Sequence, residues 1–159
     1  MTPWSKRHAA AAAASSMLVL AAAAPVVADV FNGTPRHDLI HGTADADRIN
    51  GRGGPDTLLG HNGDDHIRGG PGRDYLYDGR GEDVMRGGRG ADGITSQGGR
   101  GRVHAGPGAD SIYTEPDGAR DTFRCGSGHD SVLYTDGTQK DPRDVLISCE
   151  RLVVMRSAR

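Results

Sequence analysis

The chain has 159 residues, of which 25 are glycine and only 4% are aromatic. This length suits one domain, but the shortage of large apolar side chains excludes an ordinary globular core. A disordered chain or a repeat architecture remains. The formal net charge is −2, and the arginines are scattered among Asp and Gly with no basic run beside aromatic residues. The sequence therefore gives no sign of a nucleic-acid partner.

The N-terminus has the order of parts that is typical of a secretory signal peptide. Lys6 and Arg7 precede an Ala-rich apolar run at 9–24, and Pro25-Val26-Val27-Ala28 supplies small residues for cleavage after Ala28. A membrane anchor is the alternative, although the run is short and ends at a proline. We therefore predict a chain exported by a Sec- or Tat-type route to the extracellular space or cell surface. It would begin at Asp29 and have no membrane span.

The processed part repeats itself with a period of nine residues from Gly33 onward. Nine blocks run without a gap to Tyr113, and an eleven-residue block at 114–124 and a final block at 125–133 follow. The sixth residue of the block is Asp in ten of the eleven copies, with Gly101 as the exception, and the eighth is always apolar. The fourth is Gly in eight copies, starting at Gly54.

Each block predicts one turn and one short strand. The Gly-rich first half suits a tight turn with positive φ angles, and the last three residues form a strand whose middle side chain points inward. Two blocks then make a coil of eighteen residues. The expected fold is all-β: a right-handed parallel β-roll, or β-solenoid, over 29–133 with a C-terminal β cap.

The segment 134–159 is expected to cap the open end of the solenoid, because repeat stacks need such a cover. A loop is predicted at 136–142, and strands at 145–147 and 152–155. Asp144 and Glu150 are interpreted as solvated or capping residues. The two cysteines, Cys125 and Cys149, predict one disulfide in an exported chain, with free thiols as the alternative. A cysteine or histidine zinc site is not expected, because no CxxC motif is present.

The blocks Gly69-Gly70-Pro71-Gly72-Arg73-Asp74-Tyr75-Leu76-Tyr77 and 87–95 (GGRGADGIT) match a defined consensus, G-G-x-G-x-D-x-U-x, at every fixed position. The pattern resembles the RTX, or haemolysin-type, calcium-binding repeat. The resemblance implies that several Ca²⁺ ions lie between turns stacked one coil apart. It makes the sixth-position Asp side chains the expected metal ligands. They form two columns: a first column of Asp38, Asp56, Asp74, Asp92, Asp110 and Asp130, and a second column of Asp47, Asp65, Asp83 and Asp121.

The expected sites differ in quality along the columns. The turns that carry Asp38 and Asp47 lack Gly at position four, which makes their sites doubtful. Gly101 interrupts the second column and should leave a weakened or empty site beside Asp83. The best sites are therefore expected between the following pairs: Asp56 and Asp74, Asp74 and Asp92, Asp92 and Asp110, and Asp65 and Asp83. Affinity and the number of ions stay open.

The expected function is that of a secreted calcium-binding protein whose β-roll folds when Ca²⁺ binds between the turns. The alternatives are an extracellular adhesive or structural surface protein, an export module, and a calcium-free solenoid in which Asp only forms turns. The outward residues are mixed along the chain and favour no particular ligand. An enzyme is not expected, because only four residues, 29–32, would precede the first block after cleavage and neither HExxH nor GxSxG occurs.

Overall fold

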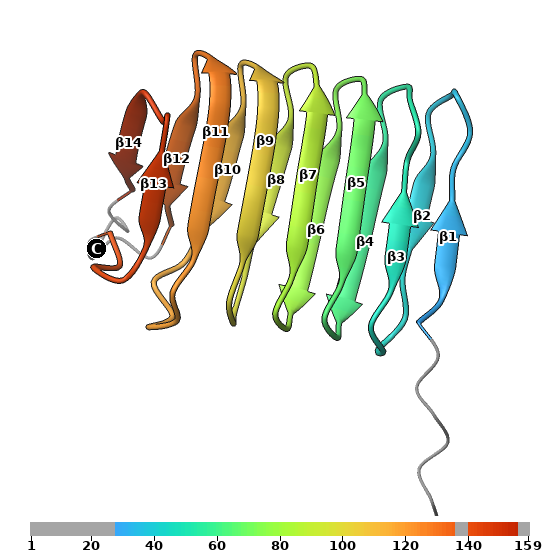
Figure 1. The fold of residues 1–159 in the computed structure, drawn as a ribbon, viewed down its shortest axis with the longest axis horizontal. Coiled ribbons are helices and arrows are strands. Elements are labelled where there is room, and N and C mark those ends of the chain that lie inside the picture. Colours follow the sequence, from blue (N-terminus) through green and yellow to red (C-terminus); the bar gives the residue numbers. More distant parts are fainter. Residues whose placement is uncertain (1–27, 136–139, 156–159) are drawn as a thin grey trace, which may run out of the picture.

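The structure is a computed structural model that describes residues 28–135 and 140–155. The predicted signal peptide and part of the loop predicted at 136–142 lie outside these residues. The described chain is all-β, and its fourteen strands form two parallel seven-stranded sheets. Figure 1 shows the strands stacked side by side along one axis, with one sheet in front of the other. The predicted β-solenoid is confirmed, with about seven coils.

Successive strands alternate between the two sheets. The odd sheet contains β1 (Val30–Asn32), β3 (Arg48–Asn50), β5 (His66–Pro71), β7 (Val84–Arg89), β9 (Arg102–Gly108), β11 (Thr122–Gly128) and β13 (Val145–Ile147). The even sheet contains β2 (Leu39–His41), β4 (Thr57–Asn62), β6 (Tyr75–Arg80), β8 (Gly93–Ser96), β10 (Ser111–Thr114), β12 (Ser131–Tyr134) and β14 (Arg151–Val154).

The pairing register follows the sequence period. Leu58 pairs with Leu76, and Ile67 pairs with Met85, each eighteen residues further along the chain. The two extra residues of the block at 114–124 lengthen one coil, so that Ile112 pairs with Val132. The insertion is therefore absorbed in a turn and leaves both sheets in register.

The core is a narrow layer of inward side chains between the sheets. From Ile49 onward, the eighth-position apolar residue of every block is at most 2% exposed, whereas Ile40 near the N-terminal end is only partly buried. The first residue of each block points inward as well. It is Gly in the first five blocks and at Gly87, and a larger residue in the others: Asp78, Ser96, Ala105, Thr114 and Cys125. Because most strands contribute only one large apolar side chain to this layer, the fold buries little apolar surface for the number of residues that it orders.

The repeat extends beyond the eleven copies visible in the sequence. Asp29 precedes β1 in the same way that each sixth-position Asp precedes its strand, and Phe31 packs against the core. At the other end, Asp144 and Glu150 precede β13 and β14, which pair in parallel with β11 and β12. The predicted C-terminal strands are therefore present, and they cover the stack by adding one more coil to it.

The predicted disulfide joins this last coil to the preceding one. Cys125 follows the core strand segment of β11, Cys149 lies between β13 and β14, and their Cα atoms are 5.1 Å apart. In the sequence, the connection from β12 to β13 is longer than those between the earlier blocks and does not follow their Gly-rich pattern. A covalent link is therefore well placed to hold the last coil on the stack.

Loss of this link should loosen the last coil first. A Cys125→Ser/Cys149→Ser variant is expected to lose about 3.5 kcal/mol of stability, by the chain-entropy estimate for a loop of this length. Hydrogen exchange followed by mass spectrometry in calcium should show faster exchange at 145–154 than at 57–94. Equal acceleration in all coils would contradict a local clamp.

Candidate calcium sites

The sixth-position residues form two columns of hydrogen bonds between coils, of which the second is interrupted at Gly101. In seven pairs, the N–H of the sixth residue donates to the Oδ1 of the Asp one coil later, at 2.8–2.9 Å; Asp56 to Asp74 and Asp74 to Asp92 are examples. These pairs join nine of the ten predicted Asp residues in the two expected columns, and Asp121 continues the second column by accepting a hydrogen bond of 2.7 Å from the Gly101 N–H. One oxygen of each carboxylate in these pairs is used to join neighbouring coils.

The second carboxylate oxygen is buried without a partner in most of these residues. Within the described chain, six Asp Oδ2 atoms are inaccessible to solvent and accept no hydrogen bond: those of Asp56, Asp65, Asp74, Asp92, Asp110 and Asp130. A buried carboxylate oxygen without a partner is costly, because it has lost its water and gained nothing in exchange. A cation bound beside these atoms would remove that cost.

Backbone oxygens lie close to these unpartnered atoms. At Gly87, a Cβ would lie 2.5 Å from Asp92 Oδ2 and 2.7 Å from the carbonyl oxygen of Ala105, one coil later. Gly51, Gly60 and Gly69 are crowded in the same way by their own Asp and by the next coil's carbonyl. Only glycine leaves room for both oxygens at these four positions, which explains the residue at the start of the block.

The fourth-position glycines bring the turns themselves into contact. Gly90 has a φ of 134°, and a Cβ there would overlap the carbonyl oxygen of Gly72 in the preceding coil. This backbone approach aligns carbonyls of successive turns beside the Asp columns. Carboxylate and carbonyl oxygens at close quarters are the donor set that Ca²⁺ prefers, so the residues present fit this ion.

The described residues contain no group of three or more His, Cys, Asp or Glu side chains that could hold a metal ion. Asp56, Asp65, Asp74 and Asp92 instead share the space around their first-position glycine with a carbonyl oxygen of the next coil. A cation at these positions would therefore draw most of its ligands from turn carbonyls, and its binding would depend on correctly stacked turns.

The two N-terminal column residues differ from the others in their hydrogen bonds. The Oδ2 atoms of Asp38 and Asp47 accept hydrogen bonds of 2.6 Å from the backbone N–H of Thr34 and Thr43, and the two threonine hydroxyls point at the same carboxylates. These carboxylates already have partners from their own turns. They have less to gain from a cation than the six unpartnered ones.

The second column changes character halfway along the stack. Its inward first position carries Gly42 and Gly60 in the early coils and then, in coil order, Asp78, Ser96, Thr114 and Tyr134, all at most 4% exposed. At the end of the series, the Tyr134 hydroxyl donates to Asp144 Oδ2 at 2.8 Å. In these coils the chain's own polar side chains occupy the space next to the carboxylate column.

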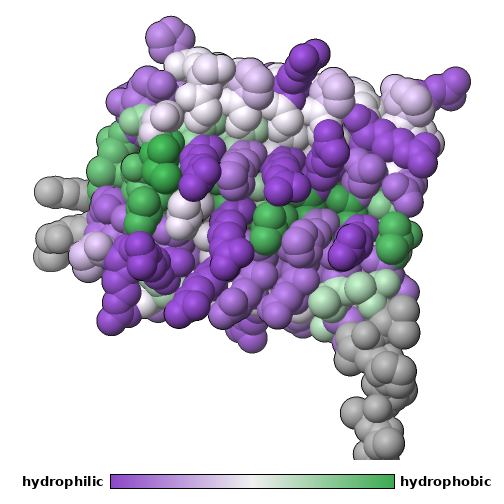
Figure 2. Space-filling model, in the orientation of Figure 1, coloured by the Kyte–Doolittle hydropathy of each residue, from purple (hydrophilic) through white to green (hydrophobic). Residues whose placement is uncertain are grey.

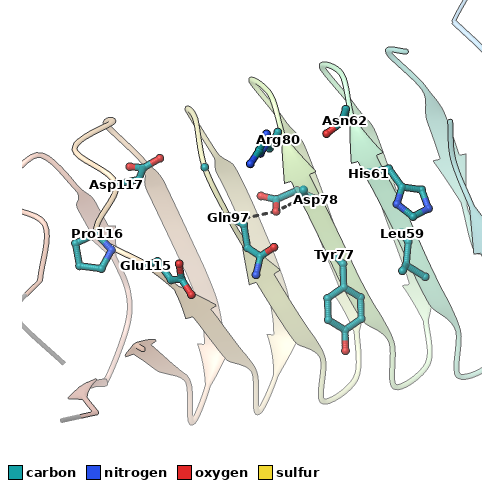
Figure 3. Close-up of a pocket in the computed structure, with 12 residues that line it drawn as sticks. Leu59, His61, Asn62, Tyr77, Asp78, Arg80, Gln97, Glu115, Pro116 and Asp117 are labelled. Atoms are coloured by element: carbon teal, nitrogen blue, oxygen red, sulfur yellow. Dashed lines mark hydrogen bonds between the residues drawn. The ribbon is translucent and has the colours of Figure 1, made fainter. Parts of the chain in front are cut away.

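Gly101 leaves a visible gap in this column. The N–H of Asp83 donates to the carbonyl oxygen of Arg100 at 3.0 Å, because no carboxylate is available at position 101. Beside the gap, Asp78 accepts hydrogen bonds from Gly79 and Gln97. Figure 3 shows Asp78 and Gln97 together in a surface hollow that is also lined by Tyr77, Arg80, Glu115 and Asp117. The pairing of Asp65 with Asp83 is present, but the cation site expected at Asp83 has the Asp78 side chain in place of glycine.

Two members of the columns escaped the sequence reasoning. Asp121 donates its N–H to Asp144 Oδ1 at 3.1 Å, and Asp130 donates to Glu150 Oε2 at 2.8 Å. Asp144 is 5% exposed, so its interpretation as a solvated residue is wrong, whereas a capping role fits both residues. The only sequence signal is an acidic residue shortly before an apolar run, Val145-Leu146-Ile147 after Asp144 and Leu152-Val153-Val154 one residue further on from Glu150, because the Gly-rich pattern is missing there.

Burial raises the pKa of the column carboxylates from Asp56 onward. The pKa values of Asp65 and Asp92 rise to about 7, and those of Asp83 and Asp110 rise to about 6. Loss of water around each carboxylate is the main cause, and neighbouring acidic side chains add to it. The stacked turns therefore disfavour negative charge as long as no cation is bound.

A pH dependence of the calcium-free chain follows from these shifts. Between the normal Asp pKa near 4 and the raised values near 6–7, the folded state binds more protons than the unfolded state, so its stability falls as pH rises. We expect decalcified residues 29–159 to show more β structure by circular dichroism at pH 4.5 than at pH 7.5. A β signal that grows with pH would contradict this expectation.

Comparison with known proteins agrees with this geometry. The model of the RTX calcium-binding nonapeptide repeat (4 copies) matches residues 28–58 and again 59–94. Residues 28–94 consist of RTX calcium-binding nonapeptide repeats. No curated protein and no solved structure matches the chain.

The RTX match agrees with the structural extent of the repeat at its N-terminal end, because it begins before Asp29. RTX repeats bind Ca²⁺ as a family, are typical of secreted proteins and are generally structural and not enzymatic. The match does not favour the adhesive alternative. Among the residues that can be described, no helix is long and apolar enough to cross a bilayer.

Proposed function

We propose that this protein is an exported calcium binder in which Ca²⁺ ions bridge successive turns and drive folding of the β-roll. The observation that carries the proposal is the set of six buried Asp Oδ2 atoms without a partner, repeated one coil apart along the columns. Calcium supplies the positive charge that these oxygens lack. The Asp Oδ1 atoms hold adjacent coils at a fixed spacing, and the glycines let carbonyl oxygens approach.

Four residues are the best candidates for ion ligands. Asp56, Asp65, Asp74 and Asp92 combine an unpartnered Oδ2 with a glycine at the first position of their block. Asp110 and Asp130 also have an unpartnered oxygen, but Ala105 and Cys125 replace that glycine. We place Asp38, Asp47, Asp83 and Asp121 lower, because neighbouring side chains or the gap at Gly101 alter their surroundings.

A calorimetric titration of residues 29–159 with calcium tests the proposal. We expect uptake of about four ions, rising to about six when the Asp110 and Asp130 sites fill, together with a gain of β structure. Magnesium should not replace calcium, because it keeps its own water shell and demands strict octahedral geometry. No heat and no spectral change in millimolar calcium would overturn the proposal.

Export and folding would be linked through calcium. Low calcium inside the cell would keep the chain unfolded for translocation, and high calcium outside would fold it after cleavage behind Ala28. N-terminal sequencing of the external protein should yield Asp29 as the first residue. A folded, calcium-loaded precursor in the cytoplasm would contradict this order of events.

A further inference from the structure

The outer surface of the odd sheet carries a regular set of arginines. Each strand exposes its seventh and ninth block positions on this surface. Across adjacent strands Arg48 pairs with His66, and Arg68 pairs with Arg86. The remaining members continue the same two rows, with Val84 opposite Arg102, Arg86 opposite His104, and His104 opposite Arg124. We call this surface the arginine face: Arg48, Arg68, Arg86, Arg102 and Arg124, all exposed, with His66 and His104 between them.

No acidic side chain accompanies these arginines. From β1 to β13, the seventh and ninth positions of the odd sheet contain no Asp or Glu. The same positions of the even sheet, from β2 to β12, carry no Arg, Lys, Asp or Glu and include Tyr75, Tyr77 and Tyr113. Figure 2 shows the odd-sheet side of the molecule, which is mostly hydrophilic over its central strands. The solenoid therefore distributes its charges unevenly: the central outward positions of the odd sheet are basic, those of the even sheet are neutral, and the turns hold the acidic residues together with further arginines such as Arg73, Arg100 and Arg120.

This arrangement is unfavourable by itself. Adjacent strands lie about 4.8 Å apart, and like charges directly opposite each other destabilise a sheet. Arg68 and Arg86 stand in this relation, and His104 lies between Arg86 and Arg124 in the same row. Burial and, after it, these two arginines lower the pKa of His104. An anionic ligand would relieve this repulsion.

The chemistry of the face indicates the kind of anion. A guanidinium group binds carboxylate and sulfate oxygens through two parallel hydrogen bonds, and a row of such groups at a fixed spacing suits a linear polymer with repeated anionic groups. Proteins that bind single-stranded nucleic acids combine a basic groove with aromatic side chains on which the bases stack, and the described tyrosines of the central strands, Tyr75, Tyr77 and Tyr113, lie on the other sheet. Insertion into a membrane surface needs apolar side chains beside the basic ones. Among the seventh and ninth positions of the odd sheet from β3 to β11, only Val84 is apolar.

We propose that the arginine face binds an acidic polysaccharide lying across the strands of the odd sheet. The inference rests on the proposed function in one respect, because the face exists only when the β-roll is folded. The acidic turn columns would repel the same polymer unless calcium neutralised them. Binding is therefore expected in calcium and not in its absence.

The test measures binding of residues 29–159, in millimolar calcium at physiological ionic strength, to heparin as a sulfated probe and to hyaluronan as a carboxylated one. The variant Arg68→Gln/Arg86→Gln/Arg124→Gln removes three charges from the face. The matched control Arg73→Gln/Arg100→Gln/Arg120→Gln removes three exposed arginines from the turns. We expect the face variant to bind at least one probe about tenfold more weakly than the unsubstituted chain, while the control stays within about twofold.

Tighter binding of heparin would indicate a sulfated polysaccharide, and tighter binding of hyaluronan would indicate a carboxylated one. Circular dichroism in calcium separates this inference from the proposed function, because both variants should keep the calcium-induced β structure. Equal loss of binding in the two variants would overturn the inference, since it would indicate a general effect of charge. Absence of binding to both polysaccharides by a folded chain, or tighter binding to a single-stranded DNA oligonucleotide, would overturn it as well.

Discussion

Removal of calcium from residues 29–159 is expected to abolish most of the β structure of the chain. The core between the sheets is one side chain deep and gives each strand little apolar burial. At neutral pH the same coils bury carboxylates, six of which have an oxygen without any partner in the described chain. Ordering the backbone costs about 1–2 kcal/mol per residue, and the buried charges add to that cost. Bound calcium reverses the electrostatic contribution, so its binding energy becomes folding energy.

The expected change is large in both secondary structure and size. Circular dichroism should lose its β signal in chelator, and small-angle scattering should show the radius of gyration rising from roughly 15 Å to roughly 35 Å. Addition of excess calcium should restore both values, whereas magnesium at the same concentration should not. A compact chain with an unchanged spectrum in chelator would show that the turns hold together without the ion.

Much of this architecture could be predicted because the residues that form each turn and strand and the residues that meet across coils follow the same sequence period. The inward apolar residue, the Asp and the glycine turn recur with the same period, so the period alone fixes which residues meet across coils. Ile67 pairs with Met85 and Asp56 bonds to Asp74 for that reason. The repeat could not be recognised in the sequence where the Gly-rich turn segment is absent. Asp29, Asp144 and Glu150 occupy column positions without the preceding Gly-rich segment, and only the stacking of coils places them.

Two further features could not be found by reading the blocks in order. Consecutive blocks belong to opposite sheets, so the outward residues look mixed along the chain, although from β2 to β13 their arginines all lie on the odd sheet. Arg48, His66 and Arg102 share one face, while Thr57 and Tyr75 lie on the other. The series of Asp78, Ser96 and Thr114 is likewise hidden in the sequence, because its members occupy the first position of every second block. Its members each stand where the earlier coils of the second column have Gly42 and Gly60.

A single neutral substitution in the first column should have opposite effects with and without calcium. Asp92→Asn keeps an oxygen that can accept the hydrogen bond from the Asp74 N–H, but it removes the negative charge beside the unpartnered atom. In calcium, the variant should lose ligand charge between neighbouring coils and need several-fold more calcium to fold, because calcium sites depend on the charge of their ligands. Without calcium, it should hold the β-roll better than the unsubstituted chain, because burial raises the pKa of Asp92 to about 7 and an amide avoids that penalty.

Two midpoints measure this reversal: the calcium concentration for half folding at pH 7.5, and the pH at which the decalcified chain gains β structure. The first should rise in Asp92→Asn, and the second should shift to higher pH, since the amide stays neutral where the carboxylate ionises. Glu82→Gln is the control, because this exposed side chain carries the same charge outside the columns and should leave both midpoints unchanged. A purely structural Asp would lower stability in both conditions when substituted. A carboxylate that binds a cation is different: its substitution should destabilise the β-roll in calcium and stabilise it without calcium. If Asp92→Asn destabilises the chain in both conditions, Asp92 is not a metal ligand.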